Sequence, residues 1–234
     1  AEMVLSNNYR QTQAISIAEQ QVNERMGEYR RFINAMESSG RLDRALEFLP
    51  DEDTLLERQT QGKSFTRPEL SVLISYAKVM LKEELADSDV PQDEYMMASV
   101  ERAFPKELHE RFRPQMYGHI LKNEIVATQV ANDMVNNMGI NFCLRLMEST
   151  GSTAGQVAKA YVTAAEIYEL EDYWCKVEAL DFKVSASVQI DLMINMTRRV
   201  RRAARWFLRN RRNHLAPADE ITLFGGPIKS LVKS

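Results

Sequence analysis

The stretch TRPELSVLISYAKVMLKEEL, residues 66–85, decides the fold that the sequence predicts. Thr66 and Glu69 have the spacing of a helix capping box, in which each side chain accepts a hydrogen bond from the backbone N–H of the other residue. Pro68 lies in the first turn, where no backbone N–H is needed. The apolar residues that recur at helical spacing are Leu70, Leu73, Ile74, Ala77, Met80 and Leu81. A helix therefore begins at this box and buries one face as far as about Leu85.

The rest of the chain repeats this pattern. Apolar residues at helical spacing are separated by short polar loops, and alternating runs of β-branched residues are almost absent. Gly40 and Gly139 are placed to end helices, and Ser152 or Thr153 is placed to begin one. The main further helices are predicted at residues 6–21, 25–39, 42–49, 95–103, 106–112, 115–138 and 184–212. The sequence thus predicts an all-α protein, a multi-helix bundle or layered helical domain with short connections.

A polar segment that contains Pro91, residues 86–93, is the best candidate for a domain boundary. We expect an N-terminal helical part at 1–88 and a second helical part at 89–234; one continuous domain is the alternative. The second part ends in a basic helix and an apolar tail. Because this tail has no closing signal, we expect the sequence to cut through a longer protein.

Composition excludes several classes of protein. The chain has 234 residues, of which 44% are hydrophobic and 27% charged, and a net charge of −3, values typical of a soluble globular protein. No apolar run approaches the roughly 18 residues that span a bilayer, and no secretory signal begins the chain. We therefore expect a cytoplasmic protein with no membrane partner. Cys143 and Cys175 are expected to be reduced and mostly buried, with a disulfide as the alternative.

The most distinctive local signal is a basic helix. Eight arginines lie between Arg198 and Arg212, above a complete apolar stripe. They could bind nucleic acid or another anion, or they could meet acidic side chains of this domain or of a neighbouring one. The second interpretation is favoured, because the chain is acidic overall and no RNA-binding signature with interleaved aromatic residues accompanies the arginines. The candidate interdomain or anion contacts are Arg198, Arg201, Arg202, Arg205 and Arg209.

A second candidate is a polar group near the end of a helix, formed by Asn132, Asp133 and Asn136. It could line a ligand cleft, but a buried hydrogen-bond network beside Gly139 is the favoured interpretation. The remaining polar motifs lack the spacing of known sites. His109, His119 and His214 are too dispersed for a metal box, and the glycines of residues 151–155 fit a helix end followed by a helix start. We therefore predict no catalytic, cofactor-binding or metal residue in this chain.

Several longer motifs occur in a recognisable order. They are SNNYRQT at 6–12, GRLDRALEFLP at 40–50, TRPELSVL at 66–73, and ANDMVN at 131–136 followed by Gly139. Together they resemble the C-terminal region of the large bacterial NAD-specific glutamate dehydrogenases. The resemblance extends from about residue 5 to residue 212, which is nearly the whole chain.

The resemblance implies a parent enzyme that oxidatively deaminates L-glutamate to 2-oxoglutarate and ammonia, with NAD as cofactor. It also implies that the dehydrogenase domain lies upstream, and none of the family's catalytic positions maps onto this chain. The sequence itself has no strand–glycine turn–helix unit for a pyrophosphate. We thus expect an inactive helical region whose partner is the upstream domain of the same polypeptide.

Its role would be scaffolding, oligomerisation or regulation, in a full-length protein that forms a homo-oligomer. The alternative is an independent nucleic-acid-binding module that uses the helix Arg198–Arg212. A regulatory amino acid or nucleotide bound between helices is a weaker third hypothesis.

Overall fold

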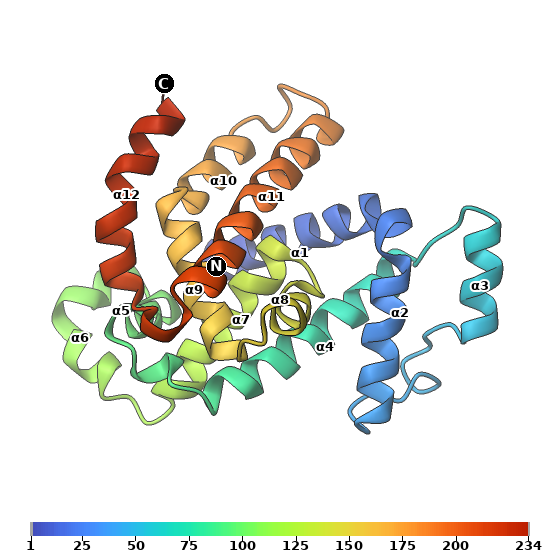
Figure 1. The fold of residues 1–234 in the computed structure, drawn as a ribbon, viewed down its shortest axis with the longest axis horizontal. Coiled ribbons are helices and arrows are strands. Elements are labelled where there is room, and N and C mark those ends of the chain that lie inside the picture. Colours follow the sequence, from blue (N-terminus) through green and yellow to red (C-terminus); the bar gives the residue numbers. More distant parts are fainter. Residues whose placement is uncertain (1, 234) are drawn as a thin grey trace. The chain divides into compact units, whose positions relative to one another are not determined.

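A computed structural model describes the backbone of residues 2–233 and the side chains of residues 10–21, 26–228 and 230. Within these residues the regular structure is entirely helical, which confirms the predicted all-α class (Figure 1). The α-helices are α1 (Glu2–Gln20), α2 (Val22–Ser38), α3 (Glu52–Thr60), α4 (Arg67–Ala86), α5 (Glu94–Met97), α6 (His109–Tyr117), α7 (Lys122–Met138), α8 (Phe142–Thr150), α9 (Ala154–Ile167), α10 (Leu170–Glu178), α11 (Ala186–Asn210) and α12 (Pro217–Lys233). Short 3-10 helices lie at Val90–Gln92, Ala98–Ala103, Lys106–Leu108 and Arg212–His214.

The chain divides into two compact units. The first comprises the described residues up to Val79 together with Val135–Phe142. The second comprises Met80–Met134 together with the described residues from Cys143 onward. The boundary that the sequence suggests near residue 88 stays a prediction about folding units.

In the first unit, the capping box at the start of α4 is present. The Thr66 N–H donates to Glu69 Oε2 at 2.6 Å, and the Glu69 N–H donates to Thr66 Oγ1 at a long 3.5 Å. Glu69 also accepts from Arg58, with Nη1 to Oε2 at 2.9 Å. The apolar stripe that follows is buried, as predicted, at Leu70, Leu73, Ile74 and Ala77 in this unit and at Met80, Leu81 and Leu85 in the second.

Gly40 ends α2 as predicted. Its φ is +68°, a conformation that glycine adopts without strain. The Gly40 N–H donates to the Glu37 carbonyl at 2.9 Å and the Arg41 N–H to the Met36 carbonyl at 3.0 Å. These two bonds form a Schellman motif and satisfy carbonyls that the helix end leaves open. The side chains of residues 6–9, in the first motif of the resemblance, lie outside the described residues.

The helix predicted at residues 42–49 is wrong, because the structure has turns there. The Asp43 carboxylate accepts from the N–H groups of Ala45 and Leu46 at 2.9 and 3.0 Å, a local bond that competes with helix formation. Phe48 then adopts a φ of +53°. Leu42 and Leu49 are buried, but Leu46 is 73% exposed, so the apolar spacing does not mark one buried helical face.

The single helix predicted at residues 115–138 is also wrong, since the structure has α6 and α7 with a turn between them. Within the second unit, the Gly118 N–H donates to the Pro114 carbonyl at 3.0 Å. His119 Nδ1 accepts from the Leu121 N–H at 3.1 Å and fixes the turn. Ile120 is 91% exposed there. The predicted end of α7 is correct, because Gly139 follows it with a φ of +91°.

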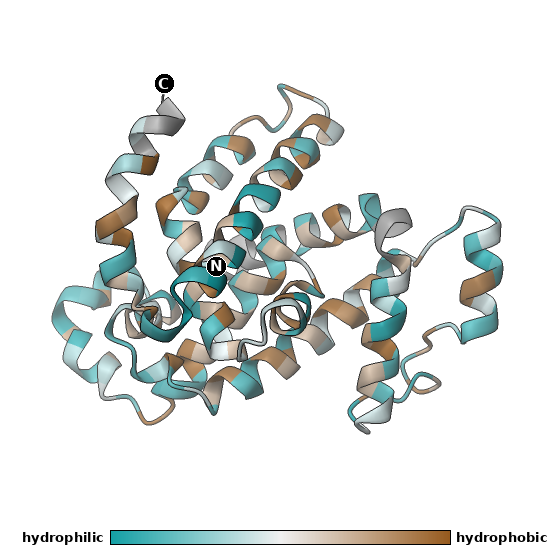
Figure 2. Cartoon of the chain, viewed as in Figure 1, coloured by the Kyte–Doolittle hydropathy of each residue, from teal (hydrophilic) through white to brown (hydrophobic). Residues whose placement is uncertain are grey.

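The core of the second unit forms around α9, which packs against α10, α11 and α12. Thr153 caps α9 with a complete capping box to Gln156, as one of the two predicted caps. Small buried residues such as Ala158, Ala160 and Ala164 let neighbouring helices approach closely. The predicted basic helix is α11, two residues shorter at each end. Its ribbon alternates between polar and apolar residues in Figure 2, as expected for a helix with one buried face.

The two cysteines differ in their environment. Both are free thiols, but only Cys143 is buried, and the expectation that Cys175 is buried is wrong. On α10, Trp174 and Val177 face the core. Cys175 follows Trp174 directly, and consecutive residues of a helix point about 100° apart, so its thiol turns away from the core. Burial raises the pKa of the Cys143 thiol.

Candidate functional site

The arginine-rich helix α11 has two distinct faces. Its buried stripe is closely packed, with Val200, Ala204, Phe207 and Leu208 each no more than 3% exposed. Of the five predicted contact residues, Arg198, Arg202 and Arg209 are exposed, and Arg201 and Arg205 are half-buried at the edges of the stripe. Because residues four and seven apart share a helical face, Arg198, Arg202 and Arg209 lie on one outer face of α11.

The outer arginines have no acidic partner among the described residues. No described Asp or Glu oxygen lies within 4.0 Å of the guanidinium groups of Arg198, Arg202 or Arg209. The expectation that this helix meets acidic side chains is therefore not met at these three positions inside the described part of the domain. A contact with another domain stays a prediction.

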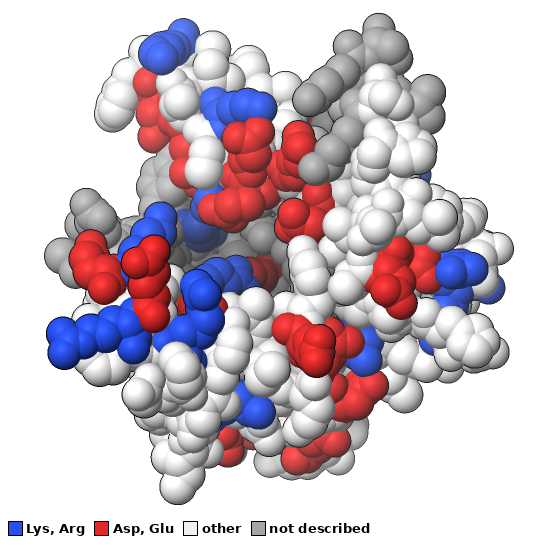
Figure 3. All heavy atoms as spheres, turned by 90° about the vertical axis from the view of Figure 1, so that its left-hand side faces the viewer, with Lys and Arg blue, Asp and Glu red and all other residues white. Residues whose placement is uncertain are grey.

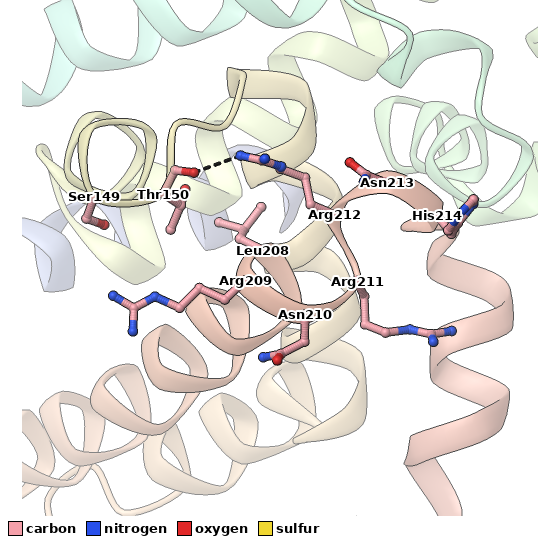
Figure 4. Close-up of a pocket in the computed structure, with 9 residues that line it drawn as sticks. All are labelled: Ser149, Thr150, Leu208, Arg209, Asn210, Arg211, Arg212, Asn213 and His214. Atoms are coloured by element: carbon pink, nitrogen blue, oxygen red, sulfur yellow. Dashed lines mark hydrogen bonds between the residues drawn. The ribbon is translucent and has the colours of Figure 1, made fainter.

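The C-terminal end of α11 borders an open pocket of about 380 Å³ (Figure 4). Arg212 Nη1 donates to the Thr150 carbonyl at 2.8 Å and to the Gly151 carbonyl at 3.2 Å, which caps the end of α8. Arg211 Nε donates at 2.9 Å to Glu220, whose side chain is 1% exposed. Figure 4 shows Arg209 and Arg211 extending to opposite sides. The pocket is lined by Ser149, Thr150, Leu208, Arg209, Asn210, Arg211, Arg212, Asn213 and His214.

These contacts make the pocket a weak site for an anion. Two of its three arginines already hold helix ends together, Arg212 through backbone carbonyls and Arg211 through Glu220. Arg209 has neither kind of partner among the described residues. The carbonyl end of α11 also carries a partial negative charge, which disfavours a bound anion and favours the arginines themselves. The pocket therefore contributes more to helix packing than to ligand recognition.

The three residues of the predicted polar group on α7 have different environments. In the second unit, the Asp133 carboxylate pairs with Arg102, and the Asp133 carbonyl accepts from the Tyr161 hydroxyl at 3.3 Å. Burial lowers the pKa of Arg102, but Asp133 outweighs it and the net pKa is raised. Asn132 is half-buried. Asn136, which belongs to the first unit, is 8% exposed, and its Oδ1 has no hydrogen-bond partner among the described residues. The three-residue network stays a prediction.

One polar cluster had no signal in the sequence. Glu101 Oε1 accepts from the Tyr117 hydroxyl at 2.6 Å and from Arg113 Nε at 2.8 Å, and His109 Nδ1 lies 3.6 Å from Glu101 Oε2. The Tyr117 and Arg113 bonds lower the pKa of Glu101 below its ordinary value of 4.5. His109, Arg113 and Tyr117 lie four residues apart on one face of α6, whereas Glu101 lies in the 3-10 helix Ala98–Ala103. Helical spacing connects the three α6 residues with one another but not with Glu101. The cluster joins α6, from its first residue to its last, to the 3-10 helix Ala98–Ala103.

The half-buried Tyr95 lies close to the carboxylate of the exposed Glu166. The pKa of Tyr95 is raised to about 12, first by burial and then by the carboxylate of Glu166. A tyrosine with so high a pKa stays protonated at neutral pH.

In the described part of the chain, no group of three or more His, Cys, Asp or Glu side chains is arranged to hold a metal ion.

On one face of the molecule, charge is mixed rather than segregated. On the face drawn in Figure 3, acidic and basic side chains lie close together in several places, without a continuous basic patch. Of the described helices, none combines the length and hydropathy that a membrane span requires.

Comparison with known proteins identifies the family. Residues 62–234 match the family model for the C-terminal region of glutamate dehydrogenase. The chain belongs to the glutamate dehydrogenase C-terminal family. The matched segment begins just before the capping box of α4 and includes all of α11.

Three relatives, each named NAD-specific glutamate dehydrogenase, extend the match to nearly the whole chain. The chain is 50% identical to the protein of Pseudomonas aeruginosa over 229 residues, which are 98% of the chain. It is 50% identical to that of Halomonas elongata and 30% identical to that of Mycobacterium tuberculosis, each over 231 residues and 99% of the chain. The chain spans about 14% of the length of each relative. The resemblance stated from the sequence motifs is confirmed. The nucleic-acid alternative gains no support from these comparisons.

Proposed function

We propose that this chain is a non-catalytic helical region of an NAD-dependent glutamate dehydrogenase, which supports the dehydrogenase body by packing against it. The parent reaction transfers a hydride from the α-carbon of L-glutamate to NAD, and water then releases ammonia and 2-oxoglutarate. The observation that carries the proposal is the family match together with the 14% coverage of relatives that are named as NAD-specific dehydrogenases.

The chemistry of the described residues supports a silent role. Hydride transfer needs a fixed nicotinamide site, usually a parallel sheet with a glycine-rich turn and the N-terminus of a helix at the pyrophosphate. The described residues form helices without a strand. Some of their charged side chains form pairs that join helices, such as Arg58 with Glu69 and Arg211 with Glu220.

If the region only supports the enzyme, its removal should affect assembly or stability but not NAD binding. The full polypeptide is compared with a version from which this chain is removed, and NAD affinity, mass in solution and melting temperature are measured for both. NAD affinity should stay within about twofold, a change of less than about 0.5 kcal/mol in binding free energy. Melting temperature or assembly should fall.

A shortened polypeptide that is still folded by circular dichroism but no longer binds NAD would show that this chain contributes to the nicotinamide site. That result would contradict the proposal. An unchanged mass and melting temperature would instead remove the supporting role.

A further inference from the structure

The outer face of α11 combines exposed arginines with an exposed tryptophan. Trp206 is 45% exposed and lies one turn after Arg202 and one turn before Arg209, so that the three side chains share this face. The Trp206 ring also packs edge-on against Phe207 at 5.2 Å and Phe224 of α12 at 5.5 Å between centroids. Ring contacts with Phe207 and Phe224 thus hold one side of the Trp206 side chain, and its other side is exposed to solvent.

The charges on this face are not explained by contacts within the described chain. Arg198 and Arg202 are four residues apart, a spacing at which like charges on a helix repel each other. The segment from 198 to 212 contains eight arginines and no Asp or Glu. A cluster that breaks a local rule without a partner in its own domain is typical of a functional surface.

From these observations we propose that the outer face of α11, defined by Arg198, Arg202, Trp206 and Arg209, docks onto the remainder of the same polypeptide, at an apolar surface rimmed by Asp and Glu. Tryptophan and arginine are the residues that most often supply the binding energy of protein interfaces. Such a surface would bury Trp206 and give the arginines acidic partners. This inference rests on the proposed function, because it names the contact through which the region supports the enzyme.

Two other occupants fit less well. A second copy of this face, related by a twofold axis, would place arginines opposite arginines, which repel. The relatives extend well beyond the segment that this chain matches, since the chain covers 14% of their length, and this leaves ample polypeptide to supply the acidic partner. Nucleic acid would also suit arginine and tryptophan, but the chain carries a net charge of −3 and offers a single exposed aromatic ring on this face.

The test is hydroxyl-radical footprinting of the full native polypeptide, with oxidation read at Trp206 by peptide mass spectrometry. The buried Trp174, at 2% exposure, is the internal reference for a protected ring. Trp206 should be oxidised as slowly as Trp174 in the native protein, and both should react rapidly after denaturation. The double change Arg202→Glu and Arg209→Glu should restore oxidation of Trp206, because the new carboxylates repel the acidic rim. The matched control, Arg31→Glu on α2, is also exposed and should leave Trp206 protected.

Each other outcome overturns the inference. A Trp206 that is oxidised much faster than Trp174 in the native polypeptide would show that the face is open. Protection that survives the double charge reversal would show that acidic partners do not hold the face, and protection that needs added DNA or RNA would assign it to nucleic acid. A Trp206 that is open in the native enzyme would leave the catalytically silent role intact, so that the two proposals fail separately.

Discussion

At the scale of single residues, Glu69 makes two separate contributions. Its carboxylate accepts from the Thr66 N–H at 2.6 Å and from Arg58 at 2.9 Å, and its side chain is 11% exposed. A carboxylate that caps a helix and also pairs with a guanidinium contributes more than an exposed ion pair would. The sequence predicted the first of these bonds from spacing, but not the second, because Arg58 belongs to a different helix.

Replacing this residue should separate the two contributions. We expect Glu69→Ala to lower the free energy of unfolding by about 1.5–3 kcal/mol, since it removes bonds to a charged group. Glu69→Gln should cost less, because its amide oxygen can still accept from the Thr66 N–H. Urea unfolding of the purified chain and of the two variants measures these changes in the free energy of unfolding. The exposed control Glu107→Ala should change stability by no more than about 0.5 kcal/mol. Equal losses in the two Glu69 variants would contradict this account.

The Glu101 cluster predicts a dependence of stability on pH. Bonds from Tyr117 and Arg113 lower the pKa of Glu101 in the folded state. A lowered folded pKa gives stability that is present above the unfolded pKa and lost as pH falls through the folded pKa. We therefore expect the chain to lose stability more steeply than a Glu101→Gln variant between about pH 5 and pH 3. Denaturant unfolding at a series of pH values measures the free energy of unfolding of both proteins. Parallel curves of this free energy against pH would show that the contacts of Glu101 do not stabilise its charged form.

At the scale of elements, α11 has one face that packs in the core and an outer face that we propose binds a partner surface. Phe207 and Trp206 are neighbours and both contact Phe224, but Phe207 is 3% exposed and Trp206 is 45% exposed. Phe207→Ala should lower the free energy of unfolding by about 3–5 kcal/mol, because it leaves a cavity in the core. Trp206→Ala should cost about 1–2 kcal/mol, mainly from lost ring contacts. Thermal unfolding of the two variants measures these losses of stability. A larger loss for Trp206→Ala than for Phe207→Ala would contradict the assignment of the buried and outer faces.

Helix ends were predicted well wherever the deciding contact is local. The caps at Thr66 and Thr153 and the glycines at 40 and 139 need only neighbours within a few residues, so spacing alone locates them. The two wrong helices fail for a different reason, although the deciding bonds are again local. Side-chain bonds from Asp43 and His119 stabilise turns, and apolar spacing cannot reveal them.

The candidate site was predicted less completely than the fold. The arginines were identified by composition, but their division into an outer face and half-buried edges depends on where α9, α10 and Phe224 of α12 pack. Spacing also placed Asn132, Asp133 and Asn136 together, whereas the partner of Asp133 is Arg102 from a distant 3-10 helix. Contacts between segments far apart in sequence carry no short-range signal.

At the scale of the whole molecule, we propose that this helical region carries no redox chemistry of its own. The family match and the all-helical structure of the described residues both support it. The most direct measurement is the absorbance of NADH when the purified chain, folded by circular dichroism, is incubated with L-glutamate and NAD. We predict no NADH above the rate without protein. Turnover that rises with the concentration of this chain, and persists after removal of any contaminating dehydrogenase, would contradict the account.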